Sequence, residues 1–129
     1  MLPDYSGKSF RNMTIARFRW QQQSFYFINT HLHTREGREQ QLEAVLREFA
    51  KHPKVILLGD FNSRADTPAL TNLLKDELVV DAIAAAGLDR NNVDRIDWIL
   101  TKGFKVETGE MLEKGVSDHP YYQVSLSYA

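Results

Sequence analysis

The sequence predicts an α/β protein: a mixed β-sheet with helices on one face. Segments with alternating or continuous apolar residues, typical of strands, flank a long amphipathic segment over residues 34–51. The 129 residues are 43% apolar and 26% charged, a composition typical of a globular domain with a substantial core. No repeat, low-complexity segment or linker divides the chain, so we expect a single domain over residues 1–129.

The first two strands are predicted from different patterns. Over residues 14–20, Ala16, Phe18 and Trp20 alternate with Arg17 and Arg19, which indicates a half-buried strand. Three glutamines at 21–23 predict a turn into a second strand over residues 25–28. This second strand is apolar on both faces, so we expect it to be central.

Three helical stretches are expected. The first runs from Thr34, its N-cap, to residue 51, and His52-Pro53 ends it. Thr67 caps a second, short helix that has Pro68 in its first turn. A third helical stretch begins at residue 79 and ends at Gly87. The residues expected to face the sheet are Leu42, Val45, Leu46, Phe49, Leu70, Leu73 and Leu74.

The remaining strands follow from short apolar runs. Residues 55–58 predict a buried strand, and residues 95–100 and 104–106 predict two strands about a turn at Lys102-Gly103. In the tail, Tyr122, Val124, Leu126 and Tyr128 share one face of a last strand.

Composition also excludes several classes of protein. The net charge is −1, so the chain is not a basic nucleic-acid wrapper, and any phosphate binding must be local. There is no cysteine, which removes thiolate chemistry and fits a reducing compartment. Neither a signal peptide nor an apolar run of membrane-spanning length is present, and we expect a cytoplasmic location.

Four polar clusters lie where predicted strands begin or end. They are N-T-H-L at 29–32, G-D-F-N at 59–62, R-I-D-W at 95–98 and S-D-H-P at 117–120. Catalytic groups gather at such places because a rigid sheet holds side chains from distant parts of a chain around one point. Together, the clusters indicate a catalytic site.

The residue types in these clusters suit hydrolysis. Asp60 follows a strongly apolar strand and can polarise a water that Asn62 helps to orient. A buried Asp97 needs a cationic or N–H partner, commonly a histidine. His119 offers an imidazole for charge that develops on a phosphoryl oxygen, and Asp118 offers a hard oxygen ligand for a divalent metal.

Each cluster also has a structural interpretation. Asp60 and Asn62 are typical of an Asx turn after a strand. Asp97 is two residues from Arg95 and shares its face, so it could be a structural partner of that arginine. His31 and His33 are also two apart, which leaves open a zinc hydrolase, ranked below the other readings. We interpret His52 as a surface residue.

The order of the four motifs closely resembles the C-terminal half of the endonuclease/exonuclease/phosphatase superfamily, from about residue 14 to the C-terminus. The resemblance implies half of a four-layer α/β/β/α sandwich. It also implies a Mg²⁺-dependent hydrolase of phosphodiester or phosphomonoester bonds, with Mn²⁺ as an alternative metal, in which water attacks phosphorus in line. The catalytic residues it implies are His31, Asp60, Asn62, Asp97 and His119, and the metal-site residues are Asp60, Asn62 and Asp118.

The resemblance covers half of that family's fold. The N-terminal half, with the glutamate that is the principal Mg²⁺ ligand, has no counterpart before Met1. A sheet with helices on one face would then leave a bare apolar face containing Phe18, Trp20, Tyr122 and Val124. We therefore expect either a homodimer or association with an N-terminal half.

Two functions remain open from the sequence. The first is a phosphoesterase acting on a phosphate ester, with nucleic acid among the candidate substrates. The alternative is a catalytically incomplete half-domain that binds a partner chain through its exposed sheet face.

Overall fold

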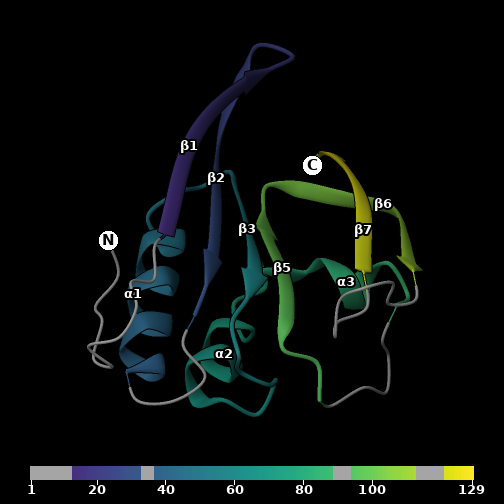
Figure 1. Cartoon of the computed structure of the whole chain (residues 1–129). Helices are drawn as coiled ribbons and strands as arrows, with labels where there is room; N and C mark the ends of the chain where they lie inside the picture. The colour runs from purple at the N-terminus through teal and green to yellow at the C-terminus, as the bar shows by residue number, and fades with distance from the viewer. Residues whose placement is uncertain (1–12, 33–36, 89–93, 113–120) are drawn as a thin grey trace.

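The computed structural model describes residues 13–32, 37–88, 94–112 and 121–129. Among them, the strands β1, β2, β3, β5 and β4 form a five-stranded sheet in that order, and β6 and β7 form a two-stranded sheet (Figure 1). The elements in chain order are β1 (Met13–Trp20), β2 (Gln23–His31), α1 (Arg38–Ala50), β3 (Val55–Asp60), α2 (Pro68–Leu73), β4 (Val80–Asp81), α3 (Ala82–Ala85), β5 (Asp97–Lys102), β6 (Phe104–Leu112) and β7 (Tyr121–Tyr128).

The five-stranded sheet is mixed, which confirms the predicted fold class. β2 pairs with β3 in parallel, whereas β1 with β2, β3 with β5, and β4 with β5 are antiparallel. The β1–β2 hairpin turns at Gln21 and Gln22, whose φ angles are 49° and 66°. Two successive left-handed residues suit the right-handed twist of the flanking strands, so this turn follows the rule for two-residue hairpins.

One face of the five-stranded sheet carries the hydrophobic core. α1 packs against it through Leu42, Val45, Leu46 and Phe49, as predicted, and α2 adds Leu70. Ile28, Val55, Leu57 and Leu100 meet them from the strands, each with no exposed surface. We call this side the covered face.

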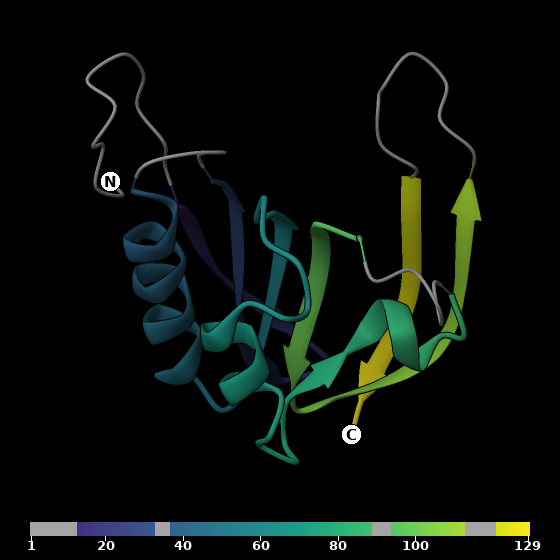
Figure 2. The same cartoon turned by 90° about the horizontal axis from the view of Figure 1, so that it is seen from below.

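The opposite side of the sheet, which we call the open face, is partly covered by β6 and β7. Alternation along the strands and their registers place the side chains of this face together; they include Phe18, Phe25, Phe27, Leu58 and Ile99. The Tyr128 ring lies 5.2 Å from the Trp20 ring, and Phe104 lies 5.3 Å from Phe25, centroid to centroid. In both views α1 lies at one end of the molecule and the β6–β7 pair at the other (Figures 1 and 2).

Exposure of the open face agrees only in part with the sequence prediction. Phe18 is 49% exposed and Trp20 46%, as expected of a bare surface. Tyr122 and Val124, however, are half-buried and belong to the second sheet. The prediction was wrong there because it placed the tail in the same sheet as the other strands, whereas β7 pairs with β6.

Residues 79–87 also differ from the prediction of a helix. Val80 and Asp81 form β4, which pairs with Thr101 and Leu100 of β5, and only Ala82–Ala85 are helical. Valine favours strand conformations. The Asp81 side chain accepts a hydrogen bond from the Ala84 N–H at 3.3 Å, so the helix begins after it.

The N-terminus of α2 lies where the sequence predicts it, whereas that of α1 does not. Thr67 is the N-cap of α2 and Pro68 occupies the first turn, as predicted, but the threonine side chain makes no capping hydrogen bond. α1 begins at Arg38 with Gly37 as its N-cap, so the prediction of Thr34 as the cap was wrong; Thr34 itself lies outside the described residues. Within the described residues, no helix has the length and apolar character needed to cross a membrane.

Candidate active site

The site begins at a glycine of β3 whose conformation leaves no room for a side chain beside β2. Gly59 has a φ of 147°, and a Cβ built on it would lie 1.9 Å from the carbonyl oxygen of Thr30. No other amino acid fits this position without moving a strand. The parallel pairing puts the last residues of the two strands, His31 and Asp60, in register with each other.

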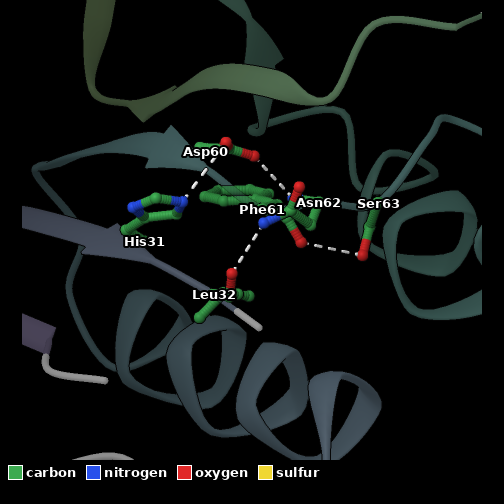
Figure 3. A network of polar contacts seen from close by, with 6 residues as sticks. All are labelled: His31, Leu32, Asp60, Phe61, Asn62 and Ser63. Carbon is green, nitrogen blue, oxygen red and sulfur yellow. Dashed lines mark hydrogen bonds and ion pairs between the residues drawn. The ribbon is translucent and has the colours of Figure 1, made fainter. Parts of the chain in front are cut away.

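Asp60, the last residue of β3, is held on both carboxylate oxygens. Its Oδ1 accepts a hydrogen bond from the Asn62 backbone N–H at 2.8 Å, and its Oδ2 lies 3.4 Å from Nε2 of His31 (Figure 3). The Asp60 side chain is 17% exposed, whereas that of His31 is 59% exposed. The carboxylate is therefore fixed in orientation but can still be reached from solvent.

Asn62 joins the loop after β3 to the end of β2. Its φ is 46°, a left-handed conformation that asparagine tolerates better than most residues. Its Nδ2 donates a hydrogen bond to the Leu32 carbonyl oxygen at 2.7 Å (Figure 3). The Asx turn that the sequence left as an alternative to a catalytic role is present, and it is the element that positions the two side chains.

An aromatic anchor beneath the turn makes it rigid. Phe61 is fully buried, and its N–H donates to the Ile96 carbonyl oxygen at 2.9 Å. The Ser63 hydroxyl donates to the Phe61 carbonyl oxygen at 3.0 Å, and Nε1 of Trp98 donates to the Ser63 carbonyl oxygen at 2.9 Å. Because the turn is tied to β5 in this way, Asp60 has little freedom to move.

Asp97, the first residue of β5, lies directly opposite Asp60 on the neighbouring strand β3. The two residues are directly opposite in the antiparallel pairing of β3 with β5, so their side chains lie on the same face. The neighbouring Arg95 forms an ion pair with Asp81, and its guanidinium lies 4.3 Å from the centroid of the Trp98 ring. Arg95 thus has a structural role of its own beside the site.

A cleft of about 380 Å³ adjoins the two aspartates. Three strands and α3 border it. Its lining residues are Leu58, Gly59, Asp60, Ile83, Asp97, Trp98, Ile99, Tyr121 and Tyr122. This volume lies in the range of small-molecule sites, so there is room for more than a phosphate group beside the aspartates.

Four of the predicted site residues come together at one rim of the open face: His31, Asp60, Asn62 and Asp97. His119, Asp118 and His33 lie outside the described residues. His52 was wrongly interpreted as a surface residue. Its side chain is 16% exposed, its ring stacks on Tyr26 at 3.9 Å, and its Nε2 lies 3.5 Å from Oε2 of Glu48.

The rim offers oxygen ligands of the kind that Mg²⁺ prefers. Among the described residues, no group of three or more histidine or acidic side chains is close enough to hold a metal. Asp60 and Asp97 nevertheless place two carboxylates opposite each other, and like charges in that arrangement repel unless a cation lies near them. The donor chemistry of these residues therefore fits a divalent cation.

Sequence reasoning missed the residues that support the site. It assigned no role to Gly59, Phe61 or Trp98, although the first two lie inside the G-D-F-N motif. A glycine directly before a polar residue at a strand end was the available signal, since it often marks close backbone approach. The place of Tyr121 and Tyr122 in the cleft lining was also missed, since Tyr122 was predicted only as part of a bare apolar face. An aromatic pair directly after S-D-H-P was the signal there.

The sequence and fold of the chain are similar to those of known proteins. The chain matches the model of the Endonuclease/Exonuclease/phosphatase family over residues 4–119, and it belongs to that family. In family and fold the chain resembles hydrolytic phosphoesterases.

Solved structures of the same fold differ in the activities and bound groups that their names give. TDP2 of D. rerio, complexed with single-strand DNA product, is 20% identical with a TM-score of 0.69 over 88% of this chain and 57% of that one. The mannosyl-6-phosphatase Bt3783 of Bacteroides thetaiotaomicron is 18% identical with a TM-score of 0.69 over 92% and 57%. The human Nocturnin catalytic domain, with bound sulfate, is 18% identical with a TM-score of 0.71 over 95% and 54%.

This chain spans little more than half of the length of these three structures. At such low identity the likeness establishes the fold alone. No curated protein sequence is significantly similar to the chain.

Proposed function

We propose that this chain carries the catalytic rim of a Mg²⁺-dependent phosphoesterase that uses water as its nucleophile. The observation that carries the proposal is the Asp60 carboxylate, fixed by the Asn62 N–H at 2.8 Å, close to His31 at 3.4 Å and opposite Asp97. Family membership adds support, since the matched region includes the first three polar motifs and residues 117–119 of the fourth. Mn²⁺ is the alternative metal.

Asp60 is the proposed general base. A carboxylate with one oxygen held by a backbone N–H and the other near the rim can accept a proton from a water that attacks phosphorus. The Asx turn orients the carboxylate through a neutral backbone N–H, so it does not neutralise the negative charge that a general base needs. Asn62 positions this turn, and its side-chain amide also helps to orient the water.

His31 and His119 are the proposed partners of the phosphate. The exposed imidazole of His31 can donate a hydrogen bond to a phosphoryl or leaving oxygen. We propose that Asp97 holds His119, whose imidazole stabilises negative charge in the transition state. A bound Mg²⁺, with Asp60, Asn62 and Asp118 as its proposed ligands, would polarise the phosphate and offset the charge of the facing carboxylates.

The experiment is hydrolysis of bis(p-nitrophenyl) phosphate by the whole chain with Mg²⁺, Mn²⁺ or EDTA. We expect hydrolysis that requires the metal and falls by roughly 10²-fold or more in His31→Ala and His119→Ala. His52→Ala, which removes an imidazole on the covered face, is the matched control and should keep the rate. Metal-independent hydrolysis, or equal loss in all three variants, would refute the assignment.

A second candidate function is a non-catalytic half-domain that binds a partner chain through the open face. The exposure of Phe18 at 49% and Trp20 at 46% favours it, because large aromatic groups in adjacent positions mark interaction surfaces. The partner could be a second copy or a chain that supplies the rest of the fold. Light scattering at low concentration tests it: a monodisperse monomer that binds no apolar dye would argue against this function.

A further inference from the structure

The strand β1 lies at one end of the five-stranded sheet, and its outer edge is a surface that another strand can join. β1 is eight residues long, and within the described residues it pairs with β2 alone. Antiparallel pairing uses the backbone N–H and C=O groups of every second residue, so the other residues of β1 direct theirs to the free edge. The β1–β2 hairpin also extends beyond the neighbouring strands (Figure 1). Such an edge is a template for strand pairing.

One side of this edge carries two positive charges. Arg17 lies opposite Tyr26, which packs against the core, so its side chain is on the covered face, and Arg19 shares that side. Both arginines are exposed, and Arg17 donates a hydrogen bond to the Ser24 hydroxyl at 3.4 Å. In the described part of the chain, neither arginine has an acidic partner. Their charge is therefore available to a second molecule.

The other side of the same edge is apolar. Phe18 and Trp20 are both about half exposed, and the Phe18 ring stacks on Phe25 at 5.6 Å between centroids. A strand added to β1 would thus meet aromatic rings on one face and guanidinium groups on the other. Since successive residues of a strand point to opposite faces, a segment in which apolar and acidic residues alternate is complementary to this edge.

Charge and hydrogen bonding decide between the candidate partners. Two copies of β1 paired about their centres would bring Arg17 of one strand opposite or diagonal to Arg17 of the other, and like charges in such positions are destabilising. The phosphates of a nucleic acid or a membrane match the charge, but they accept hydrogen bonds and cannot donate to the C=O groups of the edge. A peptide backbone supplies donors and acceptors alike.

We propose that the outer edge of β1 binds an extended acidic segment of another protein by strand addition, with acidic side chains beside Arg17 and Arg19. Apolar side chains at the alternate positions contact Phe18 and Trp20. Main-chain hydrogen bonds give affinity, and the alternating side chains give specificity. This edge lies toward the hairpin turn, whereas His31 of the catalytic rim is at the other end of β2. The inference is therefore independent of the proposed phosphoesterase activity, and it uses the edge of the sheet rather than its open face.

The test measures binding of the fluorescein-labelled peptide VEVEVEV to the whole chain by fluorescence anisotropy, at low salt and with EDTA. VKVKVKV has the same alternation with the opposite charge, and we expect it to bind at least about tenfold more weakly. A scrambled peptide of the same composition as VEVEVEV should also bind more weakly, because its glutamates do not share one face. Equal binding of the scrambled peptide would mean that the surface attracts any polyanion, as a nucleic-acid site does, and would overturn strand addition. So would equal binding of VKVKVKV, or no binding of VEVEVEV.

Variants locate the effect at the two arginines. Arg17→Gln and Arg19→Gln should each weaken binding of VEVEVEV by about two- to fivefold, since an exposed ion pair contributes modestly. Arg17→Glu combined with Arg19→Glu should reverse the preference in favour of VKVKVKV, a result that also requires a folded chain. Arg64→Gln makes the matched change at an exposed arginine after β3 and should leave binding unchanged. A preference for VEVEVEV that survives in the double variant would overturn the role of the two arginines.

Discussion

The two faces of the five-stranded sheet differ in what their residues do. On the covered face, Ile28, Leu57 and Leu100 have no exposed surface and pack against α1 and α2. On the open face, an aromatic region in which Phe18 is 49% exposed leads to a rim with His31, Asp60 and Asp97. Successive residues of one strand serve opposite faces, so β3 contributes Leu57 to stability and Asp60 to the site. Stability and the proposed chemistry thus belong to different sides of the same strands.

The largest expected effect on stability is at Gly59, where β3 lies against the backbone of β2. Gly59→Ala would place a Cβ 1.9 Å from the Thr30 carbonyl oxygen in a left-handed conformation, so β2 and β3 must separate. We expect a loss of about 3 kcal/mol or more in the free energy of unfolding, measured by urea denaturation.

Gly103→Ala is the matched control for that substitution. Gly103 also has a positive φ, of 80°, but an added Cβ would lie 2.8 Å from Cγ of Lys54 and 3.1 Å from the Pro53 carbonyl oxygen, which is less crowded than the 1.9 Å at Gly59. We expect a loss of about 1 kcal/mol. Equal losses at the two glycines would show that the approach of β2 to β3 is not the constraint described above.

Phenylalanines on the two faces provide the next comparison. Phe49→Ala removes a fully buried ring from the covered face, and we expect unfolding to become easier by about 3 to 5 kcal/mol. Phe18→Ala removes a half-exposed ring from the open face, where the expected loss is about 1 kcal/mol or less. Urea denaturation of both variants measures the difference, and a similar loss at Phe18 would mean that the open face is buried in solution.

The smallest expected effect is a pH dependence that arises on the covered face. Burial of the Lys102 ammonium lowers its pKa from the usual 10.5, and the nearby charge of Asp76 opposes that shift. The unfolded chain therefore holds this proton at pH values where the folded chain has released it, so stability rises with pH until about 10.5. Lys102→Met should flatten the rise between pH 7.5 and 10 in urea denaturation, whereas an unchanged rise would assign it to other groups.

Most strands and the long helix could be predicted from the sequence because they depend on local apolar spacing. Leu42, Val45, Leu46 and Phe49 face the core as their spacing indicates. The assignment of the tail to a second sheet could not be predicted, because the alternation from Tyr122 to Tyr128 shows which residues share a face but not which strand lies beside them. The prediction of a helix over residues 79–87 was wrong for a similar reason. Val80 adopts a strand conformation because it pairs with Thr101 of β5, which local sequence does not show.

The candidate site was predictable in its residue types and less so in its geometry. Asp60 and Asn62 lie at the end of β3, as the polar cluster indicated, and Asp97 lies opposite on β5. The hydrogen bond from Asn62 to the Leu32 carbonyl oxygen joins residues 30 apart in sequence, and no local pattern predicts it. The cleft beside the rim likewise depends on how β7 is placed.

We assign the proposed chemistry to the polar rim of the open face, and Asp60→Asn removes the carboxylate on which this assignment depends. Asp76→Asn is the matched control, because it makes the same chemical change at an exposed aspartate in the segment after α2. Rates of bis(p-nitrophenyl) phosphate hydrolysis with Mg²⁺ are measured for both variants, with circular dichroism to verify folding. We predict a loss of roughly 10²- to 10⁴-fold in Asp60→Asn and no change in Asp76→Asn. Equal rates in the two variants would contradict the claim.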